Sequence, residues 1–194
     1  NPTSTRVAAN RIWQHHFGRG LVRSSDDFGF LGTLPTHPQL LDWLATELPR
    51  LAWSRRALNR LILNSSTYRQ SSRVDPAAAT LDPLNDLLWK FDLRRLTAEE
   101  IRDAVLAVSG NLNPELGGEG VYPPLPLAVL ETASRPDAAW GQATPEQAGR
   151  RSLYIFLKRS LRHPLLEGFD QPDTDRSCSV RFATTVPTQS LMMM

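Results

Sequence analysis

Apolar side chains recur at helical spacing near the start of the chain. Five positions share one face of a helix predicted from about residue 3 to residue 17, at offsets i, i+3, i+4, i+7 and i+8: Ala9, Ile12, Trp13, His16 and Phe17. His16 therefore points toward the core, whereas His15 lies about 100° around the helix from it. Gly18 and Gly20 supply the backbone freedom that ends this helix, and Arg19 between them is placed to bind helix carbonyls or a carboxylate.

Three more helices follow from apolar spacing and capping residues. A second is predicted after Pro38, with leucines at positions 40, 41, 44 and 48 on one face and an end near position 49. A third begins after Ser54, whose side chain suits the N-cap position. Thr97 at the N-cap and Glu100 at N3 form a capping box for a fourth helix, which Gly110 closes.

Regular structure is interrupted in the second half of the chain. From 111 to 150, paired glycines and scattered prolines predict a long loop. The run 152–158 then alternates, with Leu153, Ile155 and Leu157 on one side, which predicts a strand that pairs with 180–182. A helix start follows Pro187. The expected fold is mainly α: an irregular helical domain with a small β element and a long Pro/Gly-rich loop.

The chain is expected to be one domain over residues 1–194. We divide it into a helical core (1–110), a loop insertion (111–150) and a short β element with a C-terminal helix start (151–194). It opens at Asn1 with neither an initiator Met nor a signal peptide, so we interpret it as a fragment of a longer protein. No apolar run approaches the ~18 residues that a membrane span needs.

The composition argues against nucleic-acid binding and against metal or haem sites that depend on cysteine. The 22 basic residues are 20 Arg and 2 Lys, spread among 20 acidic residues rather than gathered in a basic stripe, so we expect no nucleic-acid partner. The lone Cys178 excludes an internal disulfide, a CxxCH haem attachment and a Cys-based zinc site. We therefore predict no metal and no cofactor in this chain.

Polar residues near the predicted helix ends are the candidates for chemistry. Eight could converge in a catalytic site near the end of the first helix: His15, Arg19, Asp27, His37, Glu99, Asp103, Glu167 and Asp170. Glu99 and Asp103 stand at i and i+4, with Arg95 four residues earlier and Arg102 between them. Paired carboxylates can act as acid and base, but a salt-bridge network, either solvated or facing another domain, is the favoured interpretation. The acidic run 167–175 lacks EF-hand spacing, which favours a turn-rich loop over a calcium site.

Long motifs along nearly the whole chain are similar to one known family. They include NRIWQHHFGRGLV at 10–22, DFG at 27–29, PTHP at 35–38, TYRQSS at 67–72, IRDA at 101–104, PLLE at 164–167 and TTVPTQ at 184–189. These resemble the C-terminal domain of unknown function of planctomycete cytochrome c-associated proteins. Asn59 stands where that family commonly has a histidine, and Thr33 where an acid is expected.

The resemblance implies a setting rather than an activity. It implies an upstream companion domain in the same polypeptide, a c-type haem in another domain, and a periplasmic or extracellular location. The favoured hypothesis is a structural, partner-binding module packed on that companion, with a cytochrome c module or a glycan as a further partner. One alternative is a hydrolase or redox enzyme acting on polysaccharide. Another is a carbohydrate-binding module using Trp53, Trp89 or Trp140, of which Trp140 is expected to be exposed.

Overall fold

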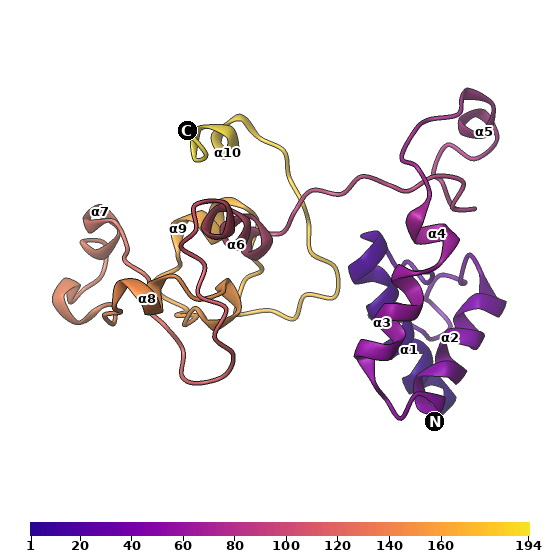
Figure 1. Cartoon of the computed structure of the whole chain (residues 1–194), viewed down its shortest axis with the longest axis horizontal. Helices are drawn as coiled ribbons and strands as arrows, with labels where there is room; N and C mark the ends of the chain where they lie inside the picture. The colour runs from indigo at the N-terminus through magenta and orange to yellow at the C-terminus, as the bar shows by residue number, and fades with distance from the viewer. The chain divides into compact units, whose positions relative to one another are not determined.

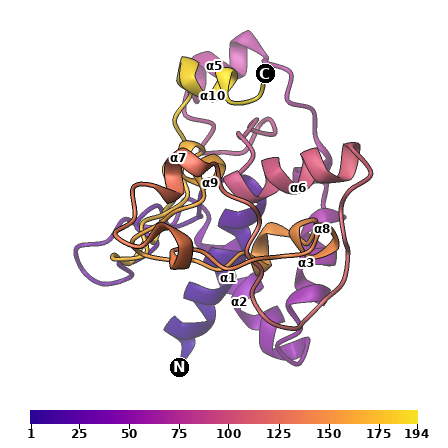
Figure 2. The same cartoon turned by 90° about the vertical axis from the view of Figure 1, so that its left-hand side faces the viewer.

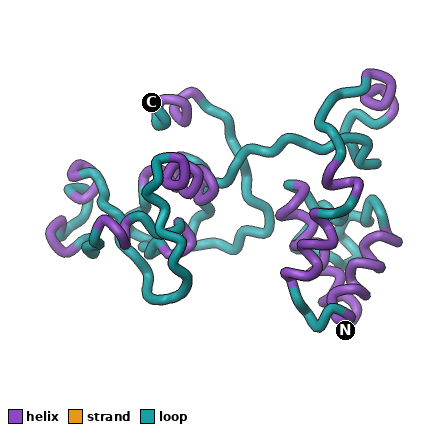
Figure 3. Tube along the Cα trace, viewed as in Figure 1, coloured by secondary structure: helices purple, strands orange, loops and turns teal.

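The computed structural model describes all residues from 1 to 194 and separates into two compact units. The first unit is Asn1–Arg94 and the second is Arg95–Met194. The chain contains ten α-helices and two short 3-10 turns, and no segment is drawn as a strand (Figure 3). The prediction of a mainly helical, irregular fold is confirmed. The assignment of 1–194 to a single domain divided after residue 110 stays a prediction.

The first unit is a small helical bundle (Figure 1). Its helices are α1 (Pro2–Phe17), α2 (Pro38–Arg50), α3 (Arg55–Leu63), α4 (Ser66–Arg69) and α5 (Pro76–Leu81). The side chain of Asn1 caps α1 by accepting a hydrogen bond from the backbone N–H of Thr3 at 2.9 Å, and Gly18 ends the helix with a φ of 79°. Ser54 caps α3 through the N–H of Ala57. The helix starts read from the sequence are therefore confirmed to within a residue.

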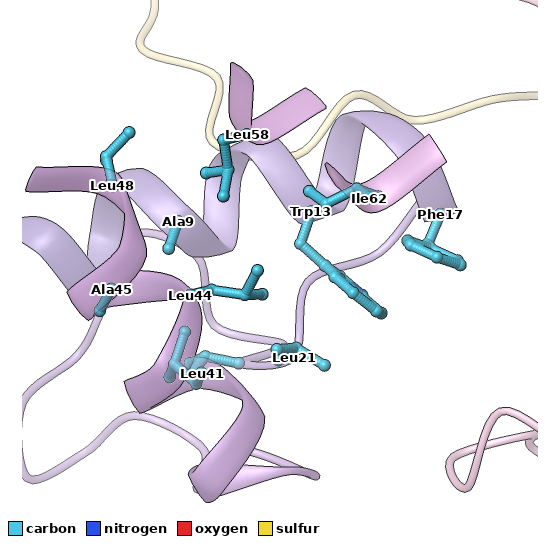
Figure 4. Close-up of a cluster of buried hydrophobic side chains, with 11 residues drawn as sticks. Ala9, Trp13, Phe17, Leu21, Leu41, Leu44, Ala45, Leu48, Leu58 and Ile62 are labelled. Atoms are coloured by element: carbon cyan, nitrogen blue, oxygen red, sulfur yellow. The ribbon is translucent and has the colours of Figure 1, made fainter. Parts of the chain in front are cut away.

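One apolar cluster holds α1, α2 and α3 together (Figure 4). Trp13 stacks on Phe17 with ring centroids 4.0 Å apart, and Tyr68 meets Phe17 edge-on. His16 lies partly buried beside them, with Nε2 3.2 Å from Oδ1 of Asn59, so its inward orientation is confirmed. The buried members are Ala9, Trp13, Phe17, Leu21, Val22, Leu41, Leu44, Ala45, Leu48, Leu58 and Ile62.

A fully buried amide ties the loop after α1 back to the helix. Asn10 is 0% exposed; its Nδ2 donates to the carbonyl of Val22 at 3.1 Å, and its Oδ1 accepts from the N–H of Val22 at 2.9 Å. Gly20 lies so close that a Cβ there would fall 2.6 Å from Nδ2 of Asn10. The side chain thus acts as a backbone partner for a segment that has no neighbouring strand.

The second unit is built around α6 (Ala98–Val108), its longest helix, which is seen side-on in Figure 2. The others are α7 (Leu127–Leu130), α8 (Pro145–Ala148), α9 (Pro164–Gly168) and α10 (Pro187–Leu191), with 3-10 turns at Pro136–Ala138 and Ser152–Tyr154. The capping box of α6 is confirmed, because Thr97 and Glu100 exchange hydrogen bonds of 2.8 and 3.3 Å. A small core joins α6 to α9: Ala98, Val121, Ile155, Leu166 and Phe169.

The predicted strand over 152–158 is wrong. The segment opens with the 3-10 turn Ser152–Tyr154, and its only pairings are two isolated bridges, a parallel one between Ile155 and Val121 and an antiparallel one between Lys158 and Leu161, with none to 180–182. Of the three residues expected on one buried face, only Ile155 is buried, whereas Leu153 and Leu157 are exposed. Asp103 explains the bend, because its carboxylate accepts the N–H of Ser152 at 2.7 Å and pulls the segment onto α6. The small β element is thus reduced to isolated bridges.

Candidate functional site

Arg19 organises the region just after the end of α1. Its Nη2 donates to the carbonyls of Leu84 and Asn85 and lies 2.8 Å from a carboxylate oxygen of Asp92. The predicted binding of a carboxylate is confirmed, whereas the predicted capping of helix carbonyls is wrong, because the two carbonyls belong to a turn beyond α5. The buried side chain of Asn85 holds that turn by donating to the carbonyl of Lys90 at 2.9 Å.

Asp92 is stabilised as an anion in this cluster. Burial alone would raise the pKa of its carboxyl, but hydrogen bonds from Lys90 and Asn85 and the positive charge of Arg19 outweigh it and hold the pKa below the ordinary value. The hollow beside these groups has a volume of only ≈10 Å³, room for about one water molecule. The cluster is built like a structural ion pair, with no space for a substrate.

The other three candidates of the first unit are held by separate contacts. Asp27 accepts the N–H of Gly29 at 2.8 Å, which forms a tight turn. His37 occupies the N-cap position of α2 without capping it, and its Nδ1 lies 3.0 Å from Oγ1 of Thr36. His15 lines a different groove, along α1. None of the three lines the hollow beside Arg19.

In the second unit, each candidate carboxylate lies in an ion pair with an arginine. The pairs are Glu99 with Arg181 at 2.7 Å, Asp103 with Arg151 at 3.3 Å, Glu167 with Arg162 at 3.9 Å, and Asp170 with Arg95 at 2.7 Å. Further along the acidic loop, Asp173 pairs with Arg162 at 2.6 Å and Asp175 pairs with Arg159. The carboxylates of 167–175 are thus divided among several arginines instead of facing a common centre.

The salt bridges expected for Glu99 and Asp103 form, but with Arg181 and Arg151 from distant segments instead of Arg95 and Arg102. Arg95 precedes the N-cap Thr97 and is not on the helix. Arg102 points into the core, is 8% exposed, and donates to the carbonyls of Ala148 at 2.6 Å and Arg150 at 3.0 Å. Burial lowers the pKa of its guanidinium, and the nearby charge of Asp103 only partly opposes this. Helical spacing placed these charges on one face but could not show that their partners lie on distant segments.

Asp170 is the most densely hydrogen-bonded candidate. Its carboxylate accepts the N–H of Thr184 at 2.8 Å and the hydroxyl of Thr184 at 3.0 Å, in addition to the ion pair with Arg95. Burial would raise its pKa, but the hydrogen bonds from Thr184 and Arg95 and the charge of Arg95 lower it overall. Gln189, 5% exposed, joins the cluster from α10 by donating to the carbonyl of Gly168 at 3.0 Å. This arrangement fastens the C-terminal segment to the end of α9.

The three tryptophans proposed as a sugar platform differ from expectation. Trp140 is only half-buried rather than exposed, since its Nε1 donates to the carbonyl of Pro123 at 2.8 Å and its ring meets Tyr122 edge-on. Trp89 is also half-buried. Trp53 is the exposed one, with 57% of its surface accessible. The expectation for Trp140 was wrong because the Pro-rich segment folds around it.

Sequence reasoning missed a half-buried histidine at the start of α9. His163 has no hydrogen-bond partner for its buried Nδ1, and burial together with the charge of Arg102 lowers its pKa to about 4. Its neighbour Pro164 marks a helix start, but no spacing or motif in the sequence indicated burial. Such a neutral imidazole is a pH-sensitive element of the fold.

Comparison with known proteins places the chain in a family without assigning an activity. The whole chain, residues 1–194, matches the family described as PSD1, protein of unknown function (DUF1553). No curated protein and no solved structure matches it. None of its helices has the length and apolar character required to cross a membrane.

Proposed function

This chain belongs to the PSD1 family of proteins of unknown function (DUF1553), and from that premise we propose that it is a partner-binding module rather than an enzyme. Its site is the display loop, which we define as residues 24–34. Three large apolar side chains of this segment are almost fully in water: Phe30 at 101% and Leu31 at 89% exposure near its tip, and Leu34 at 88% just after its base. Large apolar side chains exposed so close together in sequence favour a protein–protein contact.

The display loop is closed by a set of local hydrogen bonds. Ser24 and Thr33 exchange two of them across its base: the N–H of Ser24 donates to Oγ1 of Thr33 at 3.1 Å, and the N–H of Thr33 donates to Oγ of Ser24 at 2.8 Å. The Ser24 hydroxyl also donates to the carbonyl of Asp27 at 2.7 Å. A Cβ at position 32 would overlap that carbonyl, so Gly32 is required for the closed shape. The loop is therefore shaped in advance.

Preorganisation supports the assignment to binding. A loop already fixed in shape loses little conformational freedom on association, so more of the apolar contact energy appears as affinity. Phe30 supplies a flat aromatic anchor and the two leucines supply adjacent aliphatic surface, a combination common at the centres of interfaces. The candidate catalytic residues, in contrast, are held within local pairings.

The partner we propose is an upstream companion domain of the same polypeptide. The resemblance to planctomycete cytochrome c-associated proteins supports this, because that family combines the module with a companion domain and a c-type haem domain. The intact protein is then an envelope protein in the periplasm or outside the cell. The haem belongs to another domain in this proposal, and a glycan is a secondary partner.

Amide hydrogen exchange tests the proposal directly. The amides of 29–34 are compared between this chain alone and the longer polypeptide that contains the companion domain. We expect them to exchange rapidly in the chain alone and to be protected at least about tenfold in the longer polypeptide, since burial of the loop tip removes solvent access. Equal exchange in the two forms contradicts the proposal.

A matched pair of variants assigns the protection to the apolar tip. Leu31→Asp places a charge in the proposed contact and is expected to abolish the protection. Val74→Asp is the matched control. Val74 is an aliphatic residue of the same unit, 60% exposed and outside the display loop, so the same charge there is expected to leave the protection of 29–34 intact. Loss of protection in both variants would indicate general destabilisation instead of a specific contact.

A further inference from the structure

A second surface of the first unit carries the chemistry of a docking groove. The groove has a volume of ≈720 Å³ and runs along α1, with Trp53 and Arg55 on its other side. Val7, Ala8 and Ile12 from α1 contribute its apolar floor. These residues follow the i, i+1, i+5 spacing of one helix face, and α1 as a whole is about 24 Å long. The lining also includes Asn1, Thr3, Ser4 and His15, so the groove combines an apolar floor with polar side chains.

Trp53 is held at the edge of this groove by a strained turn. Ala52 and Trp53 have φ values of 51° and 60°, in a region that side chains other than glycine rarely adopt. The turn persists because the N–H of Trp53 donates to the carbonyl of Leu48 at 2.9 Å and the N–H of Ala52 donates to that of Pro49 at 2.9 Å. Strain of this kind is unfavourable for the fold and is common where a side chain has a function. Here the result is an indole that is 57% exposed beside an apolar floor.

The groove carries positive charge without any acidic residue. Arg11 and Arg55 line it and form no ion pair, and neither α1 nor α3 contains Asp or Glu. Elsewhere in the same unit, five cations each pair with a carboxylate: Arg6, Arg19, Arg23, Arg50 and Lys90. On the far side of Arg55, Arg56 and Arg60 extend the positive surface along α3, again without ion pairs. A partner that carries carboxylates would supply the negative charge that the groove lacks.

We propose that this groove binds an acidic amphipathic helix. The apolar stripe of such a helix would lie on Val7, Ala8 and Ile12, with Trp53 as the anchor at one edge. Its flanking carboxylates would pair with Arg11 and Arg55, whose planar forks suit carboxylates. The aliphatic floor together with the two unpaired arginines favours a helix with an apolar stripe and flanking carboxylates over a neutral sugar chain, which offers neither.

The groove and the display loop are separate surfaces, so the helix proposal does not depend on the proposed function. Neither Phe30 nor Leu31 lines the groove. A variant of the loop, Leu31→Asp, therefore leaves helix binding unchanged, and failure of one proposal is distinguishable from failure of the other.

The test uses the full chain and a designed probe. The probe is a fluorescein-labelled peptide of about 18 residues, built from Ala, Leu and Glu with a leucine stripe flanked by glutamates. A second peptide replaces every Glu by Lys, and a third scrambles the acidic sequence so that the stripe is lost. Fluorescence anisotropy measures binding of each. We expect the acidic amphipathic peptide to bind at least about tenfold more tightly than either control, and binding to weaken as salt is raised.

Substitutions locate the binding. The double variant Arg11→Glu with Arg55→Glu is expected to lose the acidic peptide by at least about tenfold and to gain affinity for the lysine peptide, because the charge pattern is reversed. Arg73→Glu makes a like change at an exposed arginine of the same unit outside the groove, and is expected to leave binding unaltered. Trp53→Ala is expected to weaken binding, whereas Trp53→Phe retains part of it.

Three results would overturn the proposal. The first is that none of the peptides binds, and the second is that the scrambled peptide binds as well as the amphipathic one. The third is that polygalacturonate competes through Arg11 and Arg55 more strongly than the acidic helix, which would assign the groove to acidic glycans instead.

Discussion

The guanidinium of Arg102 donates a 3.0 Å hydrogen bond to the main-chain carbonyl of Arg150, on a buried face of α6 where no carboxylate meets it. Arg102→Met removes this bond and the one to Ala148, leaving buried carbonyls without donors. We expect a loss of about 3 kcal/mol in the free energy of unfolding, measured by urea denaturation.

Two further substitutions distinguish a specific role of the Arg102 guanidinium from a general effect of removing an arginine. Arg102→Lys is expected to recover less than half of the loss, because an ammonium lacks the planar fork that reaches two carbonyls at once. Arg135→Met, at an exposed arginine of the same unit, is expected to change stability by less than about 0.5 kcal/mol. Equal effects at 102 and 135 would contradict a specific role for the buried guanidinium.

Asn10 and Gly20 form a coupled pair in the first unit. Asn10→Ala leaves the N–H and carbonyl of Val22 buried without partners and is expected to destabilise by about 2–3 kcal/mol. Gly20→Ala forces the Asn10 side chain away and is expected to have a similar effect. Because each change disrupts the same contact, the double variant should lose clearly less than the sum of the two, as a double-mutant cycle by thermal unfolding will show. Simple additivity would mean that the two positions act independently.

His163 makes stability depend on pH below neutrality. Its pKa lies at about 4 in the folded protein, against an ordinary value of 6.5, so the unfolded chain binds more protons between these limits. Stability contributed by the neutral imidazole is therefore present above pH 6.5 and is lost as the pH falls toward 4. Allowing for partial solvent screening, the loss is about 2 kcal/mol.

Urea titrations at several pH values measure this dependence. His163→Gln is expected to flatten the curve between pH 6.5 and pH 4, since no group at 163 then titrates. His15→Gln, at an exposed histidine of α1, serves as the control and should leave the slope in place. An unchanged slope in the position-163 variant would assign the pH dependence to other groups.

The capping box of α6 is expected to contribute measurably to stability. Thr97→Ala removes the acceptor for the N–H of Glu100 and should destabilise by about 1 kcal/mol, whereas Thr97→Ser should be nearly neutral. Chemical denaturation measures the difference. Thr174→Ala, at an exposed loop position without a capping role, is the control. A loss at 174 as large as at 97 would remove the capping explanation.

Local signals in the sequence predicted helices well and everything non-local poorly. The starts of α3 and α6 follow from Ser54 and Thr97, because a cap is decided within a few residues. The prediction of a strand at 152–158 was wrong. Alternation of side chains indicated a strand with two faces, but a hydrogen bond to Asp103, about 50 residues away in sequence, bends the segment instead.

The candidate site illustrates the same limit. The pattern around Arg19 predicted its chemistry, carbonyls and a carboxylate, but not that Asp92 supplies the carboxylate. No pattern in the sequence indicated that the side chain of Arg102 or the Nδ1 of His163 is buried. Charged and polar residues are normally assigned to the surface, even where they fall at the spacing of apolar residues. The display loop was likewise missed, because exposure of Phe30 and Leu31 is a property of the folded loop.

Arginine has an architectural part in this chain that explains its abundance over lysine. Five guanidinium groups donate to main-chain carbonyls of irregular segments: Arg19, Arg23, Arg95, Arg102 and Arg150. Carbonyls of such segments would ordinarily be satisfied by an adjacent strand or by water. With almost no sheet, the planar fork takes the place of that missing strand, satisfying several carbonyls from one residue. The chain thereby keeps long non-repetitive stretches ordered with side chains instead of a β-ladder.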